Sequence, residues 1–253
     1  MPLEVDLKGK VALVTGGGRG IGAGIAAALA EAGALTVCSS RTESELSAVA
    51  HRIRSAGGSA DVIVFSLTGE SAPTLVREVV ARHGAIDVLV HAAGNQVRKP
   101  TLDFSLEDFD AVLDVHLRAA FTLCREAVAH MVKGGSGGSI ILIGSMTSVH
   151  LGHPSTIAYN AAKSGLLGLV RTLAVEFAHA GVRANIIEPG FITSAMASQV
   201  SESAERRKIT ERTPMGRYGT PEEVGPIAAL LASDQARYIT GQAVRVDGGW
   251  SVA

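Results

Sequence analysis

The stretch Val11-Ala12-Leu13-Val14-Thr15, followed by Gly16-Gly17-Gly18-Arg19-Gly20-Ile21-Gly22, decides the fold. The first five residues are an apolar, β-branched run that predicts a strand, and the alanine-rich residues 22–32 predict a helix. Glycines at 16, 20 and 22 let the backbone between them turn tightly and approach a pyrophosphate, whose charge would meet the positive end of the helix. Because the glycines lie between the first strand and the first helix, they favour a dinucleotide site over an ordinary turn in a chain with 29 glycines.

Similar strand and helix patterns alternate along the rest of the chain. Short apolar runs predict strands buried on both faces at residues 35–38, 62–65, 88–90, 140–143 and 184–187. Helical patterns cover residues 42–56, 106–132, 158–180 and 221–232, and the glycine-rich residues 134–138 are typical of a helix stop. This alternation predicts an α/β fold, a Rossmann-like doubly wound parallel sheet with helices on both faces. Ligands are then expected at the carboxyl ends of the strands.

Length and composition indicate one domain. A chain of 253 residues with 47% hydrophobic content can bury a single large core, so residues 1–253 are expected to form one dinucleotide-binding catalytic domain. The least regular segment, residues 191–215, follows a predicted strand and is expected to cover the substrate. The 23 basic and 24 acidic residues nearly balance, which argues against a nucleic-acid or membrane partner and favours a small-molecule substrate.

The N-terminus and the cysteines predict a cytoplasmic location. Residues 1–6 carry two acids and no apolar core, unlike a secretory signal, and no apolar run is long enough to span a bilayer. Cys38 and Cys124 are expected to be buried thiols, neither of them a nucleophile, because a core of this size needs no disulfide.

The spacing Gly-x-x-x-Gly-x-Gly of the first loop resembles the short-chain dehydrogenase/reductase family. Further motifs of that family follow in order along the whole chain: His91-Ala92-Ala93-Gly94, Ser145, Tyr159-Asn160-Ala161-Ala162-Lys163, Pro189-Gly190 with Thr193, and Asp247-Gly248-Gly249. The resemblance implies an oxidoreductase that uses a nicotinamide dinucleotide.

Three residues are the candidate catalytic group. Tyr159 and Lys163 are four residues apart and share one face of a helix, where an ammonium group is expected to lower the pKa of the phenol. The resemblance implies that Tyr159 exchanges the proton with the substrate oxygen, that Lys163 also binds the nicotinamide ribose, and that Ser145 orients the substrate and stabilises developing charge. Ser148 is the competing serine, but Ser145 directly follows its predicted strand.

The resemblance also implies a set of cofactor-binding residues. They lie in the glycine loop and at the ends of the following strands: Gly16, Gly18, Arg19, Gly20, Ile21, Gly22, Ser40, Arg41, Ser66, Leu67, Ala92, Ala93, Gly94, Tyr159, Lys163, Pro189, Gly190, Ile192 and Thr193.

Three positions depart from the family pattern. His116, in Asp-Val-His-Leu, stands where an Asn usually holds a water in a proton relay, so it is either a packing residue or a relay residue, because an imidazole both donates and accepts. His91 replaces the first Asn of Asn-Asn-Ala-Gly, and its replacement is expected to remove one structural amide network. Ser66 stands where an Asp often contacts adenine.

The cofactor is expected to be NADP(H) rather than NAD(H). The second predicted strand runs into Ser39-Ser40-Arg41, so its tip carries no acid to bind ribose hydroxyls. Arg41 and Arg19 are either exposed charges or ligands of a 2′-phosphate, which guanidinium groups suit.

The candidate substrate residues are Gln96, Arg98, His150 and His153. Residues 95–100 look like the corresponding part of gluconate 5-dehydrogenases, and the overall pattern also fits 3-oxoacyl-carrier-protein reductases. No metal site is expected, because no cysteine or acid lies near the two histidines in sequence.

The predicted activity is reduction of a small ketone by NADP(H), or oxidation of the matching secondary alcohol. Alternatives are an NAD-dependent sugar-acid or polyol dehydrogenase, a dinucleotide sensor without turnover, and a non-redox enzyme on the same fold. The resemblance implies a homotetramer packed through long helices and the C-terminal segment. The natural substrate, stereochemistry and physiological direction do not follow from the sequence.

Overall fold

The structure, a computed structural model, describes residues 5–148, 152–193 and 204–253. Seven parallel strands form its sheet in the order β3-β2-β1-β4-β5-β6-β7. The predicted single-domain, Rossmann-like parallel sheet is confirmed. The strands are β1 (Val11–Thr15), β2 (Leu35–Ser40), β3 (Ser59–Val64), β4 (Val88–His91), β5 (Gly138–Ile143), β6 (Val182–Pro189) and β7 (Ala243–Val246).

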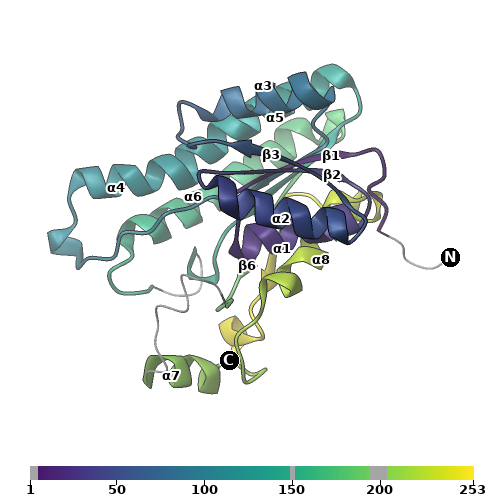
Figure 1. Cartoon of the computed structure of the whole chain (residues 1–253). Helices are drawn as coiled ribbons and strands as arrows, with labels where there is room; N and C mark the ends of the chain where they lie inside the picture. Colours follow the sequence, from purple (N-terminus) through teal and green to yellow (C-terminus); the bar gives the residue numbers. More distant parts are fainter. Residues whose placement is uncertain (1–4, 149–151, 194–203) are drawn as a thin grey trace.

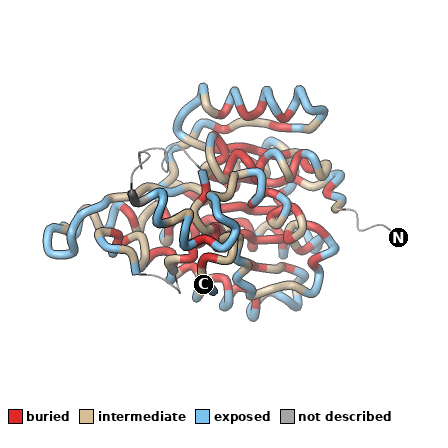
Figure 2. The backbone as a smooth tube through the Cα atoms, turned by 90° about the horizontal axis from the view of Figure 1, so that it is seen from below, coloured by how far each residue is buried: buried red, intermediate tan, exposed pale blue. Residues whose placement is uncertain are grey.

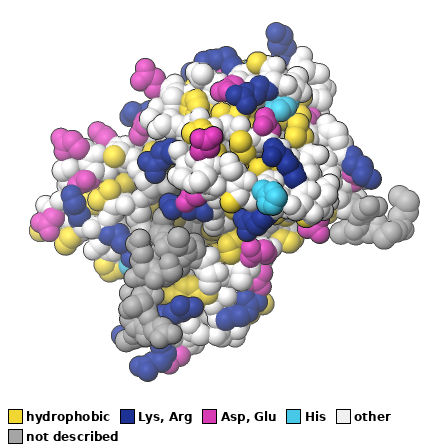
Figure 3. Space-filling view, in the orientation of Figure 1, with side chains coloured by type: hydrophobic (Ala, Val, Ile, Leu, Met, Phe, Trp, Pro, Cys, Tyr) yellow, Lys and Arg dark blue, Asp and Glu magenta, His cyan; other side chains and the backbone are white. Residues whose placement is uncertain are grey.

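Three helices cover each face of the sheet. The core on one face joins the sheet to α1 (Gly20–Glu31), α2 (Glu43–Ser55) and α8 (Pro221–Ala232). The core on the other face joins it to α3 (Ala72–His83), α5 (Ala119–Gly134) and α6 (Ile157–Phe177). Figure 1 shows the two groups above and below the strands, and Figure 2 shows buried backbone inside an exposed rim. Acidic and basic side chains alternate over the face seen in Figure 3, as expected from the balanced charge.

Burial differs between the central and the edge strands. β1 and β4 are buried along their whole length, as predicted. The prediction of burial on both faces is wrong for β3, which lies at an edge of the sheet and begins and ends with exposed residues. The other edge strand, β7, alternates between exposed and partly buried residues.

The helix predicted over residues 106–132 is interrupted. α4 (Leu106–Leu113) continues into a π-helical turn, Asp114–Arg118, and then into α5. π turns insert an extra residue into a helix and are frequent at functional sites. α5 ends as predicted in the glycine-rich segment, where Gly135 adopts a left-handed conformation with φ 69°.

Several elements were not singled out by the sequence. They are α3, β7 and α7 (Ala204–Arg212), the last of which lies within the segment expected to be least regular. α7 has four positive charges in nine residues and little apolar periodicity, while β7 is short and contains Arg245. Residues 194–203 of the expected substrate cover lie outside the described residues.

The two cysteines are buried, as expected, and burial raises the pKa of each thiol to about 12. Both therefore stay protonated and unreactive at neutral pH. Across the described ranges, no helix is long and apolar enough to cross a membrane.

Candidate active site

The site begins where the strand order reverses. The chain leaves β3 at the edge of the sheet and returns to its centre as β4, beside β1. Crevices for ligands open at the carboxyl ends of parallel strands at such a point. Thr15 and His91 are register partners at these ends, and Ser145 and Pro189 lie at the ends of β5 and β6.

The glycine loop has no room for side chains. A Cβ atom on Gly16 would lie 2.7 Å from Ala93 N, and one on Gly22 would lie 2.2 Å from Gly16 O. Gly16 also has φ 70°, in the left-handed region. The glycine loop is therefore packed directly against Ala92–Ala93 of the segment after β4. Such close packing, without side chains between, is what allows the loop backbone to approach a ligand.

The first turn of α1 is suited to an anion. Arg19, the N-cap residue, is extended and makes no side-chain cap, and the first turn contains no acidic residue. Its N–H groups and the helix dipole present partial positive charge at the glycine loop. Together with the glycine cradle, these donors fit the pyrophosphate of a dinucleotide.

Charged residues gather at the end of β2. The Oγ of Ser40 is buried and, within the described part of the chain, has no hydrogen-bond partner. Arg19 Nη1 lies 3.5 Å from Glu45 Oε1, and Arg41 is exposed. Glu45 was not among the predicted site residues, although the sequence places it in the first turn of a helix just after Arg41. Ser66, on the adjacent β3 side, is exposed, and its carbonyl accepts from Ser71 Oγ at 3.0 Å.

His91 is fully buried and forms two hydrogen bonds. Its Nε2 lies 3.1 Å from Val115 O, an oxygen that can only accept, so Nε2 carries the proton and Nδ1 accepts from Thr15 Oγ1 at 2.8 Å. Burial, with a further contribution from Lys163, lowers the pKa of His91 to about 3. In place of the amide network that this replacement was expected to remove, the neutral imidazole ties β1 and β4 to the π turn.

His116 lies on the π turn beneath Tyr159. The two rings are edge to face with centroids 5.3 Å apart, and His116 Nε2 lies 2.7 Å from Asn95 O and 3.2 Å from Asn95 N. Burial holds the pKa of His116 well below its usual value, and within the described ranges its Nδ1 has no partner. The imidazole is therefore neutral, and its Nδ1 lies in the interior without a partner among the described residues. A Cβ on Gly94 would lie 2.4 Å from His116 Cε1, so this glycine makes room for the ring.

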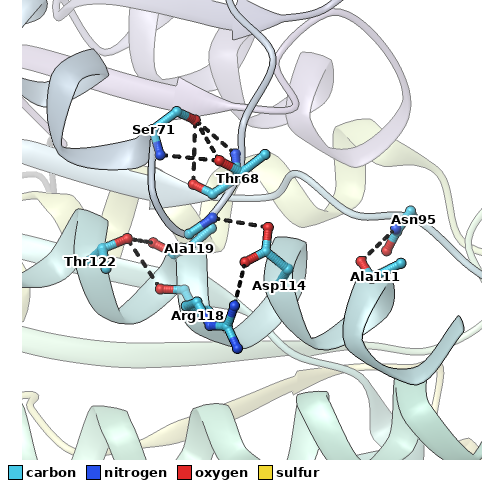
Figure 4. Close-up of polar contacts among 9 residues, drawn as sticks. Thr68, Ser71, Asn95, Ala111, Asp114, Arg118, Ala119 and Thr122 are labelled. Carbon is cyan, nitrogen blue, oxygen red and sulfur yellow. Dashed lines mark hydrogen bonds and ion pairs between the residues drawn. The ribbon is translucent and has the colours of Figure 1, made fainter. Parts of the chain in front are cut away.

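Two loops hold the end of α4 and the π turn that follows it in place (Figure 4). Asn95 Nδ2, from the loop after β4, donates to Ala111 O at 2.9 Å. Asp114 accepts from Gly69 N at 3.1 Å, in the loop after β3, and from Arg118 Nη1 at 3.3 Å. The loops that follow β3 and β4 thereby fix the segment that carries His116.

Ser145 and Tyr159 are hydrogen-bonded to each other. Ser145 is buried, and its Oγ accepts from Thr147 Oγ1 at 2.9 Å and Thr147 N at 3.2 Å. Because these donors occupy the acceptor side, the Ser145 proton is directed to the phenol oxygen. Ser145 is thus the serine that contacts Tyr159, whereas the side chain of Ser148 lies outside the described atoms. Thr147 was not predicted.

Lys163 lies one helical turn after Tyr159 on α6. Its Nζ is 5.6 Å from the centre of the Tyr159 ring and donates to Ile143 O at 2.6 Å. Burial lowers the pKa of Lys163 to about 7. The expected lowering of the Tyr159 pKa by this ammonium group is wrong: burial raises the pKa of Tyr159, and the opposing effects come from Ser145 and Arg98.

The segment after β6 is fixed by neighbouring loops. Gly190 N donates to Val246 O at 2.9 Å, and Ile192 forms a bridge with Gly219. Thr193 donates to Gly219 O through both its N, at 2.9 Å, and its Oγ1, at 3.2 Å. The predicted cofactor residues Pro189, Gly190, Ile192 and Thr193 therefore form one ordered strip at the end of the sheet.

The predicted substrate residues lie partly at the same edge. The charge of Arg98 acts on Tyr159, although the Arg98 side chain is otherwise exposed, and Gln96 is partly buried. His153 Nδ1 donates to Pro154 O at 2.8 Å, just before α6. His150 lies outside the described residues. Among the described side chains, no cluster of three or more His, Cys, Asp or Glu could hold a metal ion.

The chain is similar to known dehydrogenases and reductases over nearly its whole length. A family model described as enoyl-(acyl carrier protein) reductase matches residues 16–251. A 3-oxoacyl-(acyl-carrier-protein) reductase of Thermotoga maritima is 35% identical over 244 residues, 96% of this chain and 98% of that protein. A 3beta-hydroxysteroid dehydrogenase of Eggerthella lenta is 36% identical, over 98% of this chain and 95% of that protein.

Solved structures show the same fold. A gluconate 5-dehydrogenase from Burkholderia cenocepacia, solved in complex with NADP and tartrate, superposes with a TM-score of 0.92 at 35% identity. The match covers 99% of this chain and 98% of that one.

Proposed function

The chain belongs to the short-chain dehydrogenase/reductase family, and from this premise we propose that it transfers hydride between NADP(H) and a small ketone or the matching secondary alcohol, with Tyr159 exchanging the proton. The coarser activity follows from the family: the protein is an oxidoreductase that acts on CH–OH or C=O groups with a nicotinamide dinucleotide. The observation that carries the proposal is the Ser145–Tyr159 hydrogen bond, one helical turn from buried Lys163.

Two hydroxyl donors converge on the substrate oxygen in this proposal. Ser145, whose acceptor side is occupied by Thr147, donates a hydrogen bond to the oxygen, keeps its own proton and holds the oxygen in place. Tyr159 gives its own proton to the oxygen during reduction and takes it back during oxidation. The bound dinucleotide supplies or accepts the hydride.

Lys163 returns the proton to Tyr159. A buried ammonium group with a pKa of about 7 releases and regains a proton near neutral pH, which an exposed lysine does not. The hydrogen bond to Ile143 O holds Nζ at the end of β5. In this proposal Lys163 also binds the nicotinamide ribose. The raised pKa of Tyr159 is consistent with a phenol that stays protonated until it donates.

We assign His116 the relay role that its position suggested. Its neutral ring touches Tyr159, and Nδ1, which has no partner among the described residues, offers a place for a water that leads toward Lys163. The test compares pH–rate profiles of the native enzyme, His116→Asn and His116→Phe. We expect His116→Phe to lose about tenfold in rate with an altered profile, and His116→Asn to retain most activity. A His116→Phe enzyme with the native rate and profile would leave His116 as a packing residue.

NADP(H) is the proposed cofactor. Support comes from Arg41 and Arg19 at the end of β2, and from Ser40 Oγ, whose buried hydroxyl is available to a ribose or phosphate oxygen. The gluconate 5-dehydrogenase with which the chain superposes was solved with NADP. The ratio of kcat/KM with NADPH to that with NADH measures this preference.

A carboxylate-bearing sugar acid is the second candidate substrate. Arg98, whose charge reaches Tyr159, would pair with a carboxylate. Replacing Arg98 by Gln should then raise KM about tenfold for an acid while changing KM for a neutral ketone of similar size less than twofold. Equal effects on both substrates would remove the acid from consideration.

α7 and the rest of the described part of residues 191–215 are proposed to cover this side of the site.

The decisive experiment is turnover. Purified protein is incubated with NADPH and a panel of ketones, keto acids and 3-oxoacyl thioesters, and NADPH absorbance is followed. Oxidation of NADPH with at least one carbonyl, abolished in Ser145→Ala, supports the proposal. Binding of NADPH without turnover of any carbonyl would favour the alternative of a dinucleotide sensor.

A homotetramer is also proposed. Apolar side chains are exposed on the two long helices, Phe121 on α5 and Val175 on α6, and near the C-terminus, Val252. Covering such residues in subunit contacts would be favourable. Light scattering with size-exclusion chromatography should give about four times the chain mass of 26.0 kDa, and a monomer mass would contradict this assembly.

A further inference from the structure

An acidic side chain lies among the arginines at the end of β2. Arg19 lies in the glycine loop, just before Gly20. Arg41 follows β2, and Glu45 lies in the first turn of α2. Glu45 Oε1 is 3.5 Å from Arg19 Nη1, and the two side chains are 34% and 65% exposed. The region therefore combines the positive charges of Arg19 and Arg41 with the negative charge of Glu45, which lies close to Arg19.

Glu45 also lies directly over the glycine loop. A Cβ on Gly18 would be 2.8 Å from Ser40 Oγ and 3.3 Å from Glu45 Cβ. Ser40 and Glu45 thus flank the same point of the loop, and the Ser40 hydroxyl is buried without a partner among the described residues. A group held by Ser40 at this point would lie beside the Glu45 side chain, whose carboxylate is 3.5 Å from Arg19.

The two forms of the cofactor would interact with Glu45 in opposite ways. A ribose 2′-hydroxyl can donate a hydrogen bond to the carboxylate, which only accepts. A 2′-phosphate carries about 1.5 to 2 negative charges at neutral pH and is repelled by it. Glu45 also neutralises part of the charge of Arg19, which would otherwise attract the phosphate.

We propose that Glu45 is a cofactor-specificity residue that opposes the 2′-phosphate and supports the 2′-hydroxyl. Arg41 and Arg19 favour NADP(H), and Glu45 reduces that preference to a small margin, so the protein binds both NADP(H) and NAD(H). This inference rests on the proposed dinucleotide site, and it concerns binding rather than the carbonyl substrate.

The test measures binding of NADPH and NADH to the whole protein by fluorescence titration, without any substrate. Glu45→Gln keeps the size of the side chain and removes its charge. We expect NADPH to bind about fivefold more tightly and NADH about twofold more weakly, so that the ratio of the two Kd values shifts about tenfold. The shift should shrink at high salt, because the groups are partly exposed.

Glu43→Gln is the matched control. Glu43 lies in the same first turn of α2 and is exposed, and its replacement makes the same change in net charge. It should alter the ratio less than twofold. The proposed role of Glu45 would be overturned if the ratio of the two Kd values stayed unchanged in Glu45→Gln, or if it shifted equally in both variants. If the native protein binds neither cofactor, the dinucleotide site itself is wrong, whereas absence of turnover with intact binding leaves this inference testable.

Discussion

The two ends of the proposed cofactor site are built from different physical interactions. At the end of β2, Arg19, Arg41 and Glu45 are wholly or partly exposed charges that act through solvent. At the ends of β4 and β5, His91, His116 and Lys163 are buried, and the pKa of each is lowered.

This difference predicts how each end responds to change. Interactions between exposed charges are screened by salt, and each typically contributes about 1 kcal/mol or less to the free energy of folding or binding. Buried polar groups depend on fixed partners, and the loss of one partner typically costs about 1–3 kcal/mol. The buried end should therefore control catalysis and stability, while the exposed end should adjust only the choice of cofactor.

The largest effect is expected for Tyr159→Phe. The variant keeps the ring that packs on His116 but has no proton to exchange, so kcat should fall about a thousandfold or more. Steady-state kinetics with the best carbonyl from the panel measures this. The Kd for NADPH is measured as well, so that a loss in kcat is separated from the loss of a cofactor contact of Tyr159. A fall of less than tenfold would assign the proton to another group.

The next effect is a pH dependence of stability caused by Lys163. The pKa of this group is about 7 in the folded chain against 10.5 for an ordinary lysine. Between these values the unfolded chain binds a proton that the folded chain does not, so the stability contributed by this group rises with pH. Lys163→Met removes the titration.

Urea unfolding at pH 7.5 and pH 9.5 measures this dependence. The free energy of unfolding of the native protein, minus that of Lys163→Met, should increase by about 3 kcal/mol between the two pH values, at about 1.4 kcal/mol per pH unit. Taking the difference cancels the other titrating groups. A constant difference would mean that Lys163 stays charged in the folded protein.

Breaking the His91 network should have a smaller effect on stability. His91→Leu leaves the Thr15 hydroxyl and Val115 O buried without their partner, which should lower the free energy of unfolding by about 2 kcal/mol. Thr15→Val should cost about 1 kcal/mol. The matched control is Thr36→Val, because Thr36 Oγ1 is buried and has no partner among the described residues. If Thr36→Val destabilises as much as Thr15→Val, the hydrogen bond to His91 contributes nothing.

The same comparison explains what the sequence could predict. Local patterns identified the glycine loop and central strands, because strand periodicity and turn chemistry depend on neighbouring residues. The Tyr159–Lys163 pair followed from helical spacing, and the hydrogen bond between Ser145 and Tyr159 agrees with the choice of serine. The edge position of β3 depends on the strand order, which the run of apolar residues does not contain.

Other features depend on tertiary contacts. The sequence located His91 and His116 as departures, but not the bonds to Thr15, Val115 and Asn95 that replace an amide network. It gave the wrong direction for the pKa of Tyr159, because helical spacing does not report burial. Glu45 was missed because its proximity to Arg19 spans 26 positions along the chain.

The smallest predicted effect tests the exposed end. Arg41→Gln removes one positive charge beside the proposed 2′-phosphate, so binding of NADPH should weaken about fivefold at low salt, while binding of NADH should change less than twofold. At 0.5 M salt the loss for NADPH should fall below about twofold, because the Debye length is then shorter than the separation of most exposed charges. Arg52→Gln, in the last turn of α2, is the control for net charge and should leave both affinities unchanged. A loss that persists at high salt would instead indicate a desolvated contact with Arg41, and the contrast between an exposed and a buried end of the site would then not hold.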